Sequence, residues 1–251
     1  IVIQKVSETM EELAMRAKNG RWLQNQNREK IAKFLHANPN EIAICRNATE
    51  GVNIAARSLP LKAGDEVILT KDEHVGGVTP WLALQKDIGI EIKLVELDHS
   101  GKNNLQIIED AIGQKTKVVF FSHVTCTTGL LLPAKEIAAL CRERGIYSCV
   151  DGAQAVGMID VNLEEIQADF YMTSGHKWLF GPKGSGILYI NKSVIADCNP
   201  TFVGAYSDQK FDFENLTLEF RQSADRTEYG TRNMPITAGL GQAVEFIGAL
   251  G

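Results

Sequence analysis

The sequence lacks the features by which membrane proteins, nucleic-acid-binding proteins and repeat proteins are recognised. No apolar run approaches the roughly 20 residues that a membrane-spanning helix needs, so no membrane partner is expected. The 26 basic residues do not outnumber the 31 acidic residues, and a net charge of −5 argues against nucleic acid as the main partner. No internal repeat and no low-complexity segment is present. The hydrophobic share of 44% and the charged share of 23% are typical of an ordinary soluble domain.

Paired cysteines are also absent. The five cysteines are an odd number, and none forms a C-x-x-C pair. Three of them lie in or beside apolar segments, so we expect buried free thiols in a reducing compartment and a cytoplasmic protein. Cys126 lies in a turn-like stretch, where a nucleophilic role stays open.

Short apolar runs alternate with helix-like segments through the middle of the chain. The runs EVILT (residues 66–70) and KVVFFSHV (residues 117–124) predict strands that are buried on both faces. The segment PAKEIAALCRERG (residues 133–145) begins with proline and ends with glycine, as helices often do. This alternation predicts an α/β fold in which a mostly parallel sheet is sandwiched by helices.

The pattern divides the chain into two expected parts. Residues 1–36 are typical of a helical segment, and residues 37–251 of one large domain. Between residues 199 and 232 the alternation loosens into polar and aromatic residues. The last helical stretch, residues 236–250, stops without a capping residue, so we expect the chain to be part of a larger protein.

Polar and small residues follow the predicted strands. Ligands of open α/β sheets bind at the carboxyl ends of the strands, so these stretches indicate where a ligand would lie. They suit a charged, planar ligand. The stretches are RNATEG, KDEHVGG, TCTTG, DGAQ and GHKW.

Taken singly, the residues of these stretches allow ordinary structural roles. Ala48 and Thr49 begin a predicted helix, whose free N–H groups favour a phosphate, although Thr49 is also typical of a plain helix cap. Asp151 directly follows an apolar run, where a carboxylate needs a positive partner or caps a turn. His74 at a strand end is typical of a structural histidine.

Lys177 is the strongest single signal. It lies between His176 and Trp178 in TSGHKWLFGPKGSGILYI (residues 173–190), with small residues before it and a glycine-rich turn after it. A lysine that loses hydration beside apolar residues has a lowered pKa and can act as a nucleophile, whereas a surface lysine does not. A phosphate site, a buried carboxylate and a reactive lysine are together what pyridoxal phosphate (PLP) needs for its phosphate, its ring nitrogen and its aldehyde.

Six stretches of this sequence resemble the class V aminotransferase family, in the cysteine desulfurase-like branch of fold type I PLP enzymes. They run in the family's order across nearly the whole chain. The resemblance implies that residues 37–251 are the PLP-binding large domain. It also implies that a C-terminal small domain, which brings the substrate-binding arginine and any catalytic cysteine, lies outside this chain. The stretches are RNATEGVN, EHVGGVTPW, SHVTCTTGLLLP, VDGAQAVG, TSGHKWLFGPKGSGILYI and EYGTRN.

The resemblance further implies a role for each matching residue. Lys177 would form the Schiff base with PLP and then move the α-proton of the substrate. Asp151 would pair with the pyridinium nitrogen, and His74 would stack over the ring. A homodimer with shared active sites is implied because one phosphate contact comes from the neighbouring subunit. The remaining cofactor contacts would be Gln154 to the phenolic oxygen, Ala48, Thr49, Ser174 and His176 to the phosphate, and Thr231 to the phosphate of the neighbouring subunit.

One position departs from the desulfurase pattern. Cys126 stands where cysteine desulfurases usually carry an asparagine near the cofactor's oxygen. TCTTGLLLP, GTRN and NPTFVG look more like isopenicillin N epimerase-like and cyst(e)ine C–S lyase-like members. From the resemblance we expect a small amino-acid substrate and C–S bond cleavage of cysteine or a cysteine derivative, by β-elimination or desulfuration. The alternative is an aminotransferase or an amino-acid epimerase. A scaffold without activity is disfavoured because Lys177 and Asp151 are both present.

Overall fold

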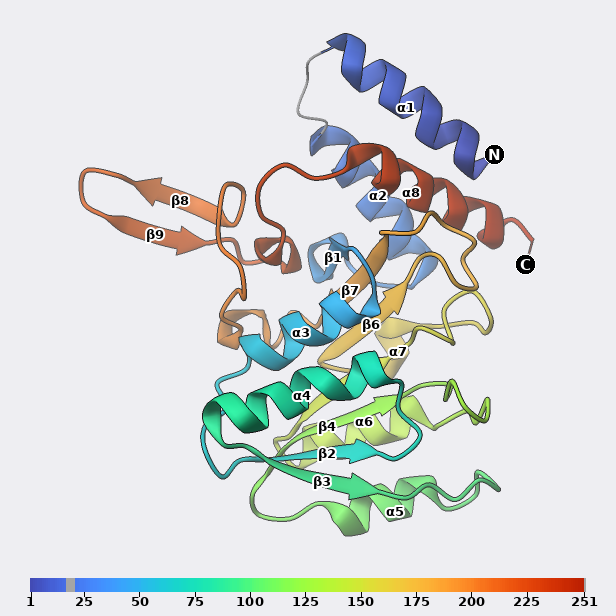
Figure 1. Cartoon of the computed structure of the whole chain (residues 1–251), viewed down its shortest axis with the longest axis vertical. Coiled ribbons are helices and arrows are strands. Elements are labelled where there is room, and N and C mark those ends of the chain that lie inside the picture. The colour runs from blue at the N-terminus through green and yellow to red at the C-terminus, as the bar shows by residue number, and fades with distance from the viewer. Residues whose placement is uncertain (17–20, 251) are drawn as a thin grey trace.

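A seven-stranded sheet forms the centre of the fold, in a computed structural model that describes residues 1–16 and 21–250 (Figure 1). The strand order is β1-β7-β6-β5-β4-β2-β3. The strands are β1 (Ile42–Cys45), β2 (Glu66–Thr70), β3 (Glu91–Val95), β4 (Thr116–Ser122), β5 (Tyr147–Asp151), β6 (Phe170–Ser174) and β7 (Gly186–Ile190).

Most neighbouring strands run in parallel. β2 pairs in parallel with β3 and β4, β4 with β5, and β5 with β6. β7 is antiparallel to both of its neighbours, β1 and β6. The short connection of residues 175–185 turns the chain directly back from β6 into β7, which an antiparallel pair permits and a parallel pair does not. The prediction of a mostly parallel α/β sheet is confirmed.

Helices cover both faces of this sheet, as predicted. Successive strand residues point to opposite faces, and two neighbours in β4 illustrate this. Phe121 belongs to a buried cluster with residues of α2, α5, α6, α7 and α8, whereas Phe120 belongs to a second cluster with residues of α3 and α4. The helices are α1 (Val2–Arg16), α2 (Arg21–Phe34), α3 (Ala48–Ser58), α4 (Val75–Ile88), α5 (Asn104–Ala111), α6 (Ala134–Glu143), α7 (Leu163–Ile166) and α8 (Met234–Gly248).

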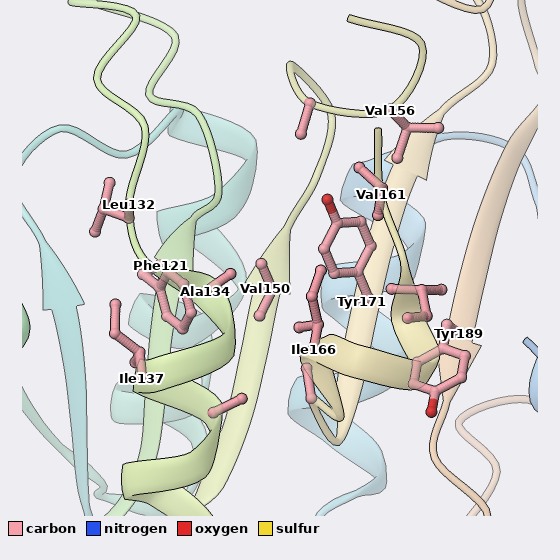
Figure 2. Close-up of a cluster of buried hydrophobic side chains, with 14 of the residues drawn as sticks. Phe121, Leu132, Ala134, Ile137, Val150, Val156, Val161, Ile166, Tyr171 and Tyr189 are labelled. Atoms are coloured by element: carbon pink, nitrogen blue, oxygen red, sulfur yellow. The ribbon is translucent and has the colours of Figure 1, made fainter. Parts of the chain in front are cut away.

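The first of these clusters is shown in part in Figure 2. The ring of Tyr171, on β6, lies among Val156, Val161 and Ile166, and each of these four residues is buried. On the other face, α3 approaches β6 so closely that a Cβ atom at Gly51 would lie 2.7 Å from the Cβ of Met172. Because both faces are covered, the strands appear in the sequence as continuous apolar runs.

Both N-terminal helices pack against α8 (Figure 1). Within this part, Ile31 and Ala32 of α2 and the following Leu35 belong to the buried core. The described residues of this part lie largely in α1 and α2, and the division of the chain at residue 36 stays a prediction. Among the described helices, none combines the length and the apolar character required to cross a bilayer.

Two elements differ from the sequence-based expectation. The run TPWLALQKDIG (residues 79–89) predicts a helix, but α4 begins four residues earlier, at Val75, because the His74 side chain caps it by accepting a hydrogen bond from Gly76 N. The loosened segment contains a hairpin of β8 (Asp208–Asp212) and β9 (Thr217–Phe220), which projects from the body of the molecule (Figure 1). Most side chains of this hairpin are exposed, so the sequence shows no alternation that would predict strands.

Candidate active site

The candidate residues gather where the parallel strands end and the covering helices begin. Asp151 is the last residue of β5, and Ser174 is the last residue of β6. Ala48 is the first residue of α3, and His74 caps the start of α4. Lys177 follows β6 by three residues. The carboxyl edge of the sheet is the position at which α/β folds bind their ligands.

Asp151 forms the buried floor of this site. Its residue is only 6% exposed, and burial raises the pKa of its carboxyl group. Three neighbours act in the opposite direction and lower that pKa: a hydrogen bond from Ala153 N to Oδ1 at 2.9 Å, and electrostatic interactions with Lys177 and then with His74. Lys177 and His74 therefore both lie within electrostatic range of this carboxylate. A buried carboxylate in such a position favours a cationic group beside it.

The turn that carries Lys177 is held rigidly on both sides. Gly175 N donates to Ser185 O at 2.8 Å, and Gly181 N donates to Gly175 O at 2.7 Å. A Cβ atom at Gly175 would collide with the side chain of Ser185, so the close approach requires glycine. Lys177 itself is half-buried. The small residues around this lysine thus serve a compact turn that presents its amine at the edge of the sheet.

The N-termini of α3 and α4 lie next to each other on one side of the site. Ala48 N donates to the Oγ atom of Ser174 at 3.0 Å, which joins the start of α3 to the end of β6. Thr49 is exposed, and a Cβ atom at Gly76 would collide with its hydroxyl group. A Cβ atom at Gly186 would lie 2.7 Å from the Cα of Asn47. Two helix N-termini in close proximity, with glycine keeping them close, fit a phosphate group.

Gln154 and His176 also lie beside the lysine turn. Gln154 accepts a hydrogen bond at its Oε1 atom from Trp178 Nε1 at 2.8 Å, and Trp178 directly follows Lys177. His176 is exposed, and its pKa is lowered by burial first and then by the positive charges of Lys177 and Lys183. Both residues are therefore within the group that the sequence predicted.

His74 is held in one orientation by its own helix. Its Nδ1 atom accepts a hydrogen bond from Gly76 N at 3.0 Å, which fixes the orientation of the ring. The ring is exposed on its other side. The arrangement leaves an oriented imidazole at the mouth of the site.

Cys126 faces the same group of charges. Burial raises the pKa of its thiol, the charge of Lys177 lowers it, and Glu73 and Asp151 raise it further. The net pKa is raised, so the thiol form is favoured at neutral pH and the nucleophilic role that the sequence left open loses support.

Thr231 is exposed and lines a small hollow together with Gln24, Tyr206 and Arg232. None of the other predicted site residues lines this hollow. Its predicted contact was to the phosphate of a neighbouring subunit, and that role stays a prediction.

Two titratable residues of the site escaped the sequence analysis. Glu73 accepts hydrogen bonds from Thr70 and Ser122, and burial raises its pKa to about 7. His123 is buried directly after β4, where its Nδ1 atom lies 2.9 Å from the Tyr171 hydroxyl, and burial lowers its pKa to about 4. The sequence signal was position alone. Glu73 lies three residues after the predicted strand of residues 66–70, and His123 lies next to the last residue of the predicted strand of residues 117–124.

A hollow of about 800 Å³ lies elsewhere, between α2, α8 and the loop that follows β5. Its lining includes Lys30, Phe34, Met158 and Glu245, and it includes none of the predicted site residues. The carboxyl edge of the sheet therefore remains the candidate active site on chemical grounds rather than on size.

A family model described as Aminotransferase class-V matches residues 4–251. The chain belongs to the aminotransferase class-V family. This match spans nearly the whole class-V chain, including every residue of the candidate site. The resemblance inferred from the sequence motifs is confirmed.

Curated relatives of this class-V chain have two kinds of activity in their names. A probable cysteine desulfurase from Methanothermobacter thermautotrophicus is 31% identical over 89% of this chain and 55% of the relative. An isopenicillin N epimerase from Streptomyces clavuligerus is 38% identical over 71% of this chain and 46% of the relative. The chain spans about half the length of these relatives.

Solved structures of similar fold include a cystine C–S lyase, C-DES, in complex with its reaction product cysteine persulfide. The TM-score is 0.92 at 29% identity, and the match covers 100% of this chain and 69% of the other. A mutant of C-DES with glycine covalently linked to its PLP cofactor gives a TM-score of 0.92 at 28% identity, covering 100% of this chain and 68% of the other.

The class-V chain has the residues that PLP requires, in one place. The buried carboxylate of Asp151 suits a protonated ring nitrogen, and the adjoining N-termini of α3 and α4 suit a phosphate. Lys177 offers an amine from a rigid turn beside that carboxylate. The structure therefore fits the cofactor on geometric as well as chemical grounds.

Proposed function

We propose that this class-V chain is the cofactor-binding part of a PLP-dependent enzyme that cleaves the C–S bond of cysteine or a cysteine derivative, by β-elimination or desulfuration. The observation that carries the proposal is the electrostatic interaction of Lys177 and His74 with the buried carboxylate of Asp151. The similarity to cysteine desulfurases and to a cystine C–S lyase supports a sulfur-containing amino acid as the substrate.

Lys177 and Asp151 carry the central roles. The amine of Lys177 would hold the cofactor through its aldehyde and would carry the α-proton of the substrate. The Asp151 carboxylate would keep a proton on the ring nitrogen. When bound, PLP supplies the electron sink that accepts the pair left by this proton. His74, whose ring is oriented by the hydrogen bond from Gly76 N, would stack over the cofactor ring and help to exclude water from it.

The other site residues orient the ligand. Because the Oε1 atom of Gln154 already accepts from Trp178, its Nε2 group is the one that donates to the phenolic oxygen. The starts of α3 and α4 would hold the phosphate, because the dipoles of both helices favour an anion there. The phosphate contacts are Ala48, Thr49, Ser174 and His176.

The protein is a homodimer in this proposal, with Thr231 reaching the phosphate of the neighbouring subunit. Thr231 is exposed and lines a hollow that contains none of the other site residues, which supports a contact to a second chain. A cytoplasmic location is supported by the five cysteines, which are all free.

The alternative is an aminotransferase or an amino-acid epimerase. The 38% identity to an isopenicillin N epimerase favours it. All of these reactions begin with loss of the α-proton to Lys177, and they differ in what then faces the β-carbon and the opposite face of the substrate. The residues of the candidate site serve each of them.

The test is the product profile of the full-length protein with PLP and either L-cysteine or L-cystine. Pyruvate, alanine and sulfide are assayed together, with Lys177→Ala as the inactive variant and Lys183→Ala as a matched control, because Lys183 is an exposed lysine on the same turn. Pyruvate with sulfide identifies an eliminating lyase, and alanine with sulfur transfer identifies a desulfurase. If neither forms while wild type and Lys183→Ala show the absorption band of bound cofactor, the proposal gives way to the alternative. If wild type lacks that band, the cofactor assignment is wrong.

A further inference from the structure

Glu73 joins the carboxyl ends of two neighbouring strands of the sheet. Its Oε1 atom accepts hydrogen bonds from Thr70 Oγ1 at 2.6 Å and from Ser122 N at 2.8 Å. Its Oε2 atom accepts from Ser122 Oγ at 2.6 Å. Thr70 is the last residue of β2, and Ser122 is the last residue of β4. One carboxylate thus holds both strand ends with three hydrogen bonds.

The groups held by Glu73 lead directly to two residues of the proposed active site. On one side, the next residue in the chain is His74, whose ring caps α4. On the other side, Ser122 is paired with Asp151 in the register of β4 and β5, and His123 N donates to Asp151 O at 2.9 Å. A shift of the Glu73 side chain would therefore move both the covering imidazole and the floor carboxylate.

We propose that Glu73 is a positioning residue for the cofactor site: it fixes the distance between His74 and Asp151 by joining the end of β2, which leads to His74, to the end of β4, which pairs with the strand that carries Asp151. The inference rests on the proposed function for its role in cofactor binding. Glu73 touches no reacting group in this assignment, because its carboxylate oxygens are occupied by Thr70 and Ser122.

The chain contains a matched comparison at the opposite end of the same two strands. The Oε1 atom of Glu66 accepts a hydrogen bond from Thr116 Oγ1 at 2.6 Å, and the two residues are paired in the register of β2 and β4. This link resembles that of Glu73 in its chemistry and in the strands it joins, but it lies at the amino ends, away from the site. If Glu73 has a purely structural role, removing either link should change amide exchange and PLP release equally. If Glu73 positions the site, only its removal should change them.

The amide of glutamine can reproduce the hydrogen bonds of Glu73. Its oxygen would accept from Thr70 Oγ1 and Ser122 N, and its nitrogen would donate to Ser122 Oγ, which can reverse its own role. Burial raises the pKa of Glu73 to about 7, so the neutral acid, which glutamine mimics, is well populated near neutral pH. Glu73→Gln should therefore keep the position of His74, while Glu73→Ala should release it.

The test compares Glu73→Ala, Glu73→Gln and Glu66→Ala with the wild-type full-length protein. Hydrogen exchange at the amides of Gly76 and Gly77, both bonded to His74, is measured on the apoprotein. The release rate of PLP is measured on the holoenzyme. Glu73→Ala should speed both exchange and PLP release by about tenfold, the size of effect that is common when a residue that supports a ligand-binding residue is lost. Glu73→Gln and Glu66→Ala should both stay within about twofold of wild type.

Two results would overturn the inference: exchange at Gly76 and Gly77 that is unchanged in Glu73→Ala, or changes of the same size in Glu66→Ala. If Glu73→Ala does not fold, Thr70→Val removes one of the three donors and is judged by the same criteria. A wild-type protein that fails to bind PLP would refute the proposed function alone, because the exchange measurement on the apoprotein still decides the role of Glu73.

Discussion

The buried carboxylate of Glu228 joins three parts of the chain that are far apart in the sequence. Its two oxygens accept hydrogen bonds from Arg28 Nη1 at 2.7 Å and Nη2 at 3.1 Å, and Oε1 also accepts from Ile44 N at 2.6 Å. Gln24 contacts the same carboxylate. Arg28 and Gln24 lie on α2, and Ile44 lies on β1. We predict that Glu228→Ala strongly lowers the free energy of unfolding, because it detaches α2 from the sheet.

The magnitude follows from the burial of the groups that would lose their partner. Arg28 is only 6% exposed. Burial lowers the pKa of its guanidinium, but the charge and hydrogen bonds of Glu228 outweigh burial and leave the pKa raised. Removing one partner of a buried ion pair typically costs about 3–5 kcal/mol, because the other charge stays buried without compensation. The expected loss for Glu228→Ala is therefore about 3–5 kcal/mol.

The assay is equilibrium unfolding in urea, with two controls. Glu245→Ala removes an exposed ion pair, in which Glu245 of α8 lies 2.9 Å from Lys30 of α2. This substitution should lower the free energy of unfolding by less than about 1 kcal/mol. The double variant Arg28→Leu with Glu228→Leu removes both charges and should recover part of the loss. The reasoning is refuted if Glu228→Ala costs no more than Glu245→Ala, or if the double variant is less stable than Glu228→Ala.

Two further predictions concern residues close to the site. Gly152→Ala should destabilise the protein by about 1–3 kcal/mol in urea unfolding, because its Cβ would overlap the buried ring of Tyr171. The control is Gly113→Ala, which has open space around it and should be close to neutral. Equal effects of the two substitutions would contradict this packing argument. Burial raises the pKa of Glu73 from 4.5 to about 7, and Asp151 adds to the shift. Between these pH values the folded wild-type protein retains a proton that the unfolded chain loses. The folded state of wild type therefore becomes less stable as the pH rises between these values. Glu73→Gln lacks this dependence, so its stability relative to wild type should rise by about 2 kcal/mol from about pH 5 to about pH 8; a constant difference would show that the pKa is not raised.

The strands were predictable because their burial is nearly complete. Val67, Ile68 and Leu69 in β2 face two different apolar clusters, so each needs an apolar side chain whichever way it points. The hairpin of β8 and β9 offered no such signal, since its side chains are mostly exposed. The early start of α4 was missed because it depends on a histidine cap, a choice that helix-start statistics rank below serine, threonine, aspartate and asparagine.

The candidate site was predictable wherever local sequence and chemistry coincide. Asp151 follows an apolar run, and Lys177 lies in a glycine-rich turn, so each is conspicuous along the chain. Glu73 is not conspicuous, because it lies in the polar stretch KDEHVGG and resembles a surface acid. Its partner Ser122 is 49 residues away in the sequence, and only the parallel pairing of β2 with β4 brings the two together.

Glu73 and Asp151 lie at the same edge of the sheet, but they have different partners, and these indicate different roles. The oxygens of Glu73 are engaged by hydroxyl and amide groups of the protein itself, which suits a structural link. Asp151 accepts from Ala153 N, and the pKa of its carboxyl group is also lowered by the side chains of Lys177 and His74. A positively charged ring nitrogen placed beside Asp151 would favour its ionised form further, since opposite charges at short range lower the pKa of a carboxyl group. Asp151, which is desolvated, would therefore be stabilised by a cationic ligand, whereas the hydrogen bonds of Glu73 are already supplied by the protein.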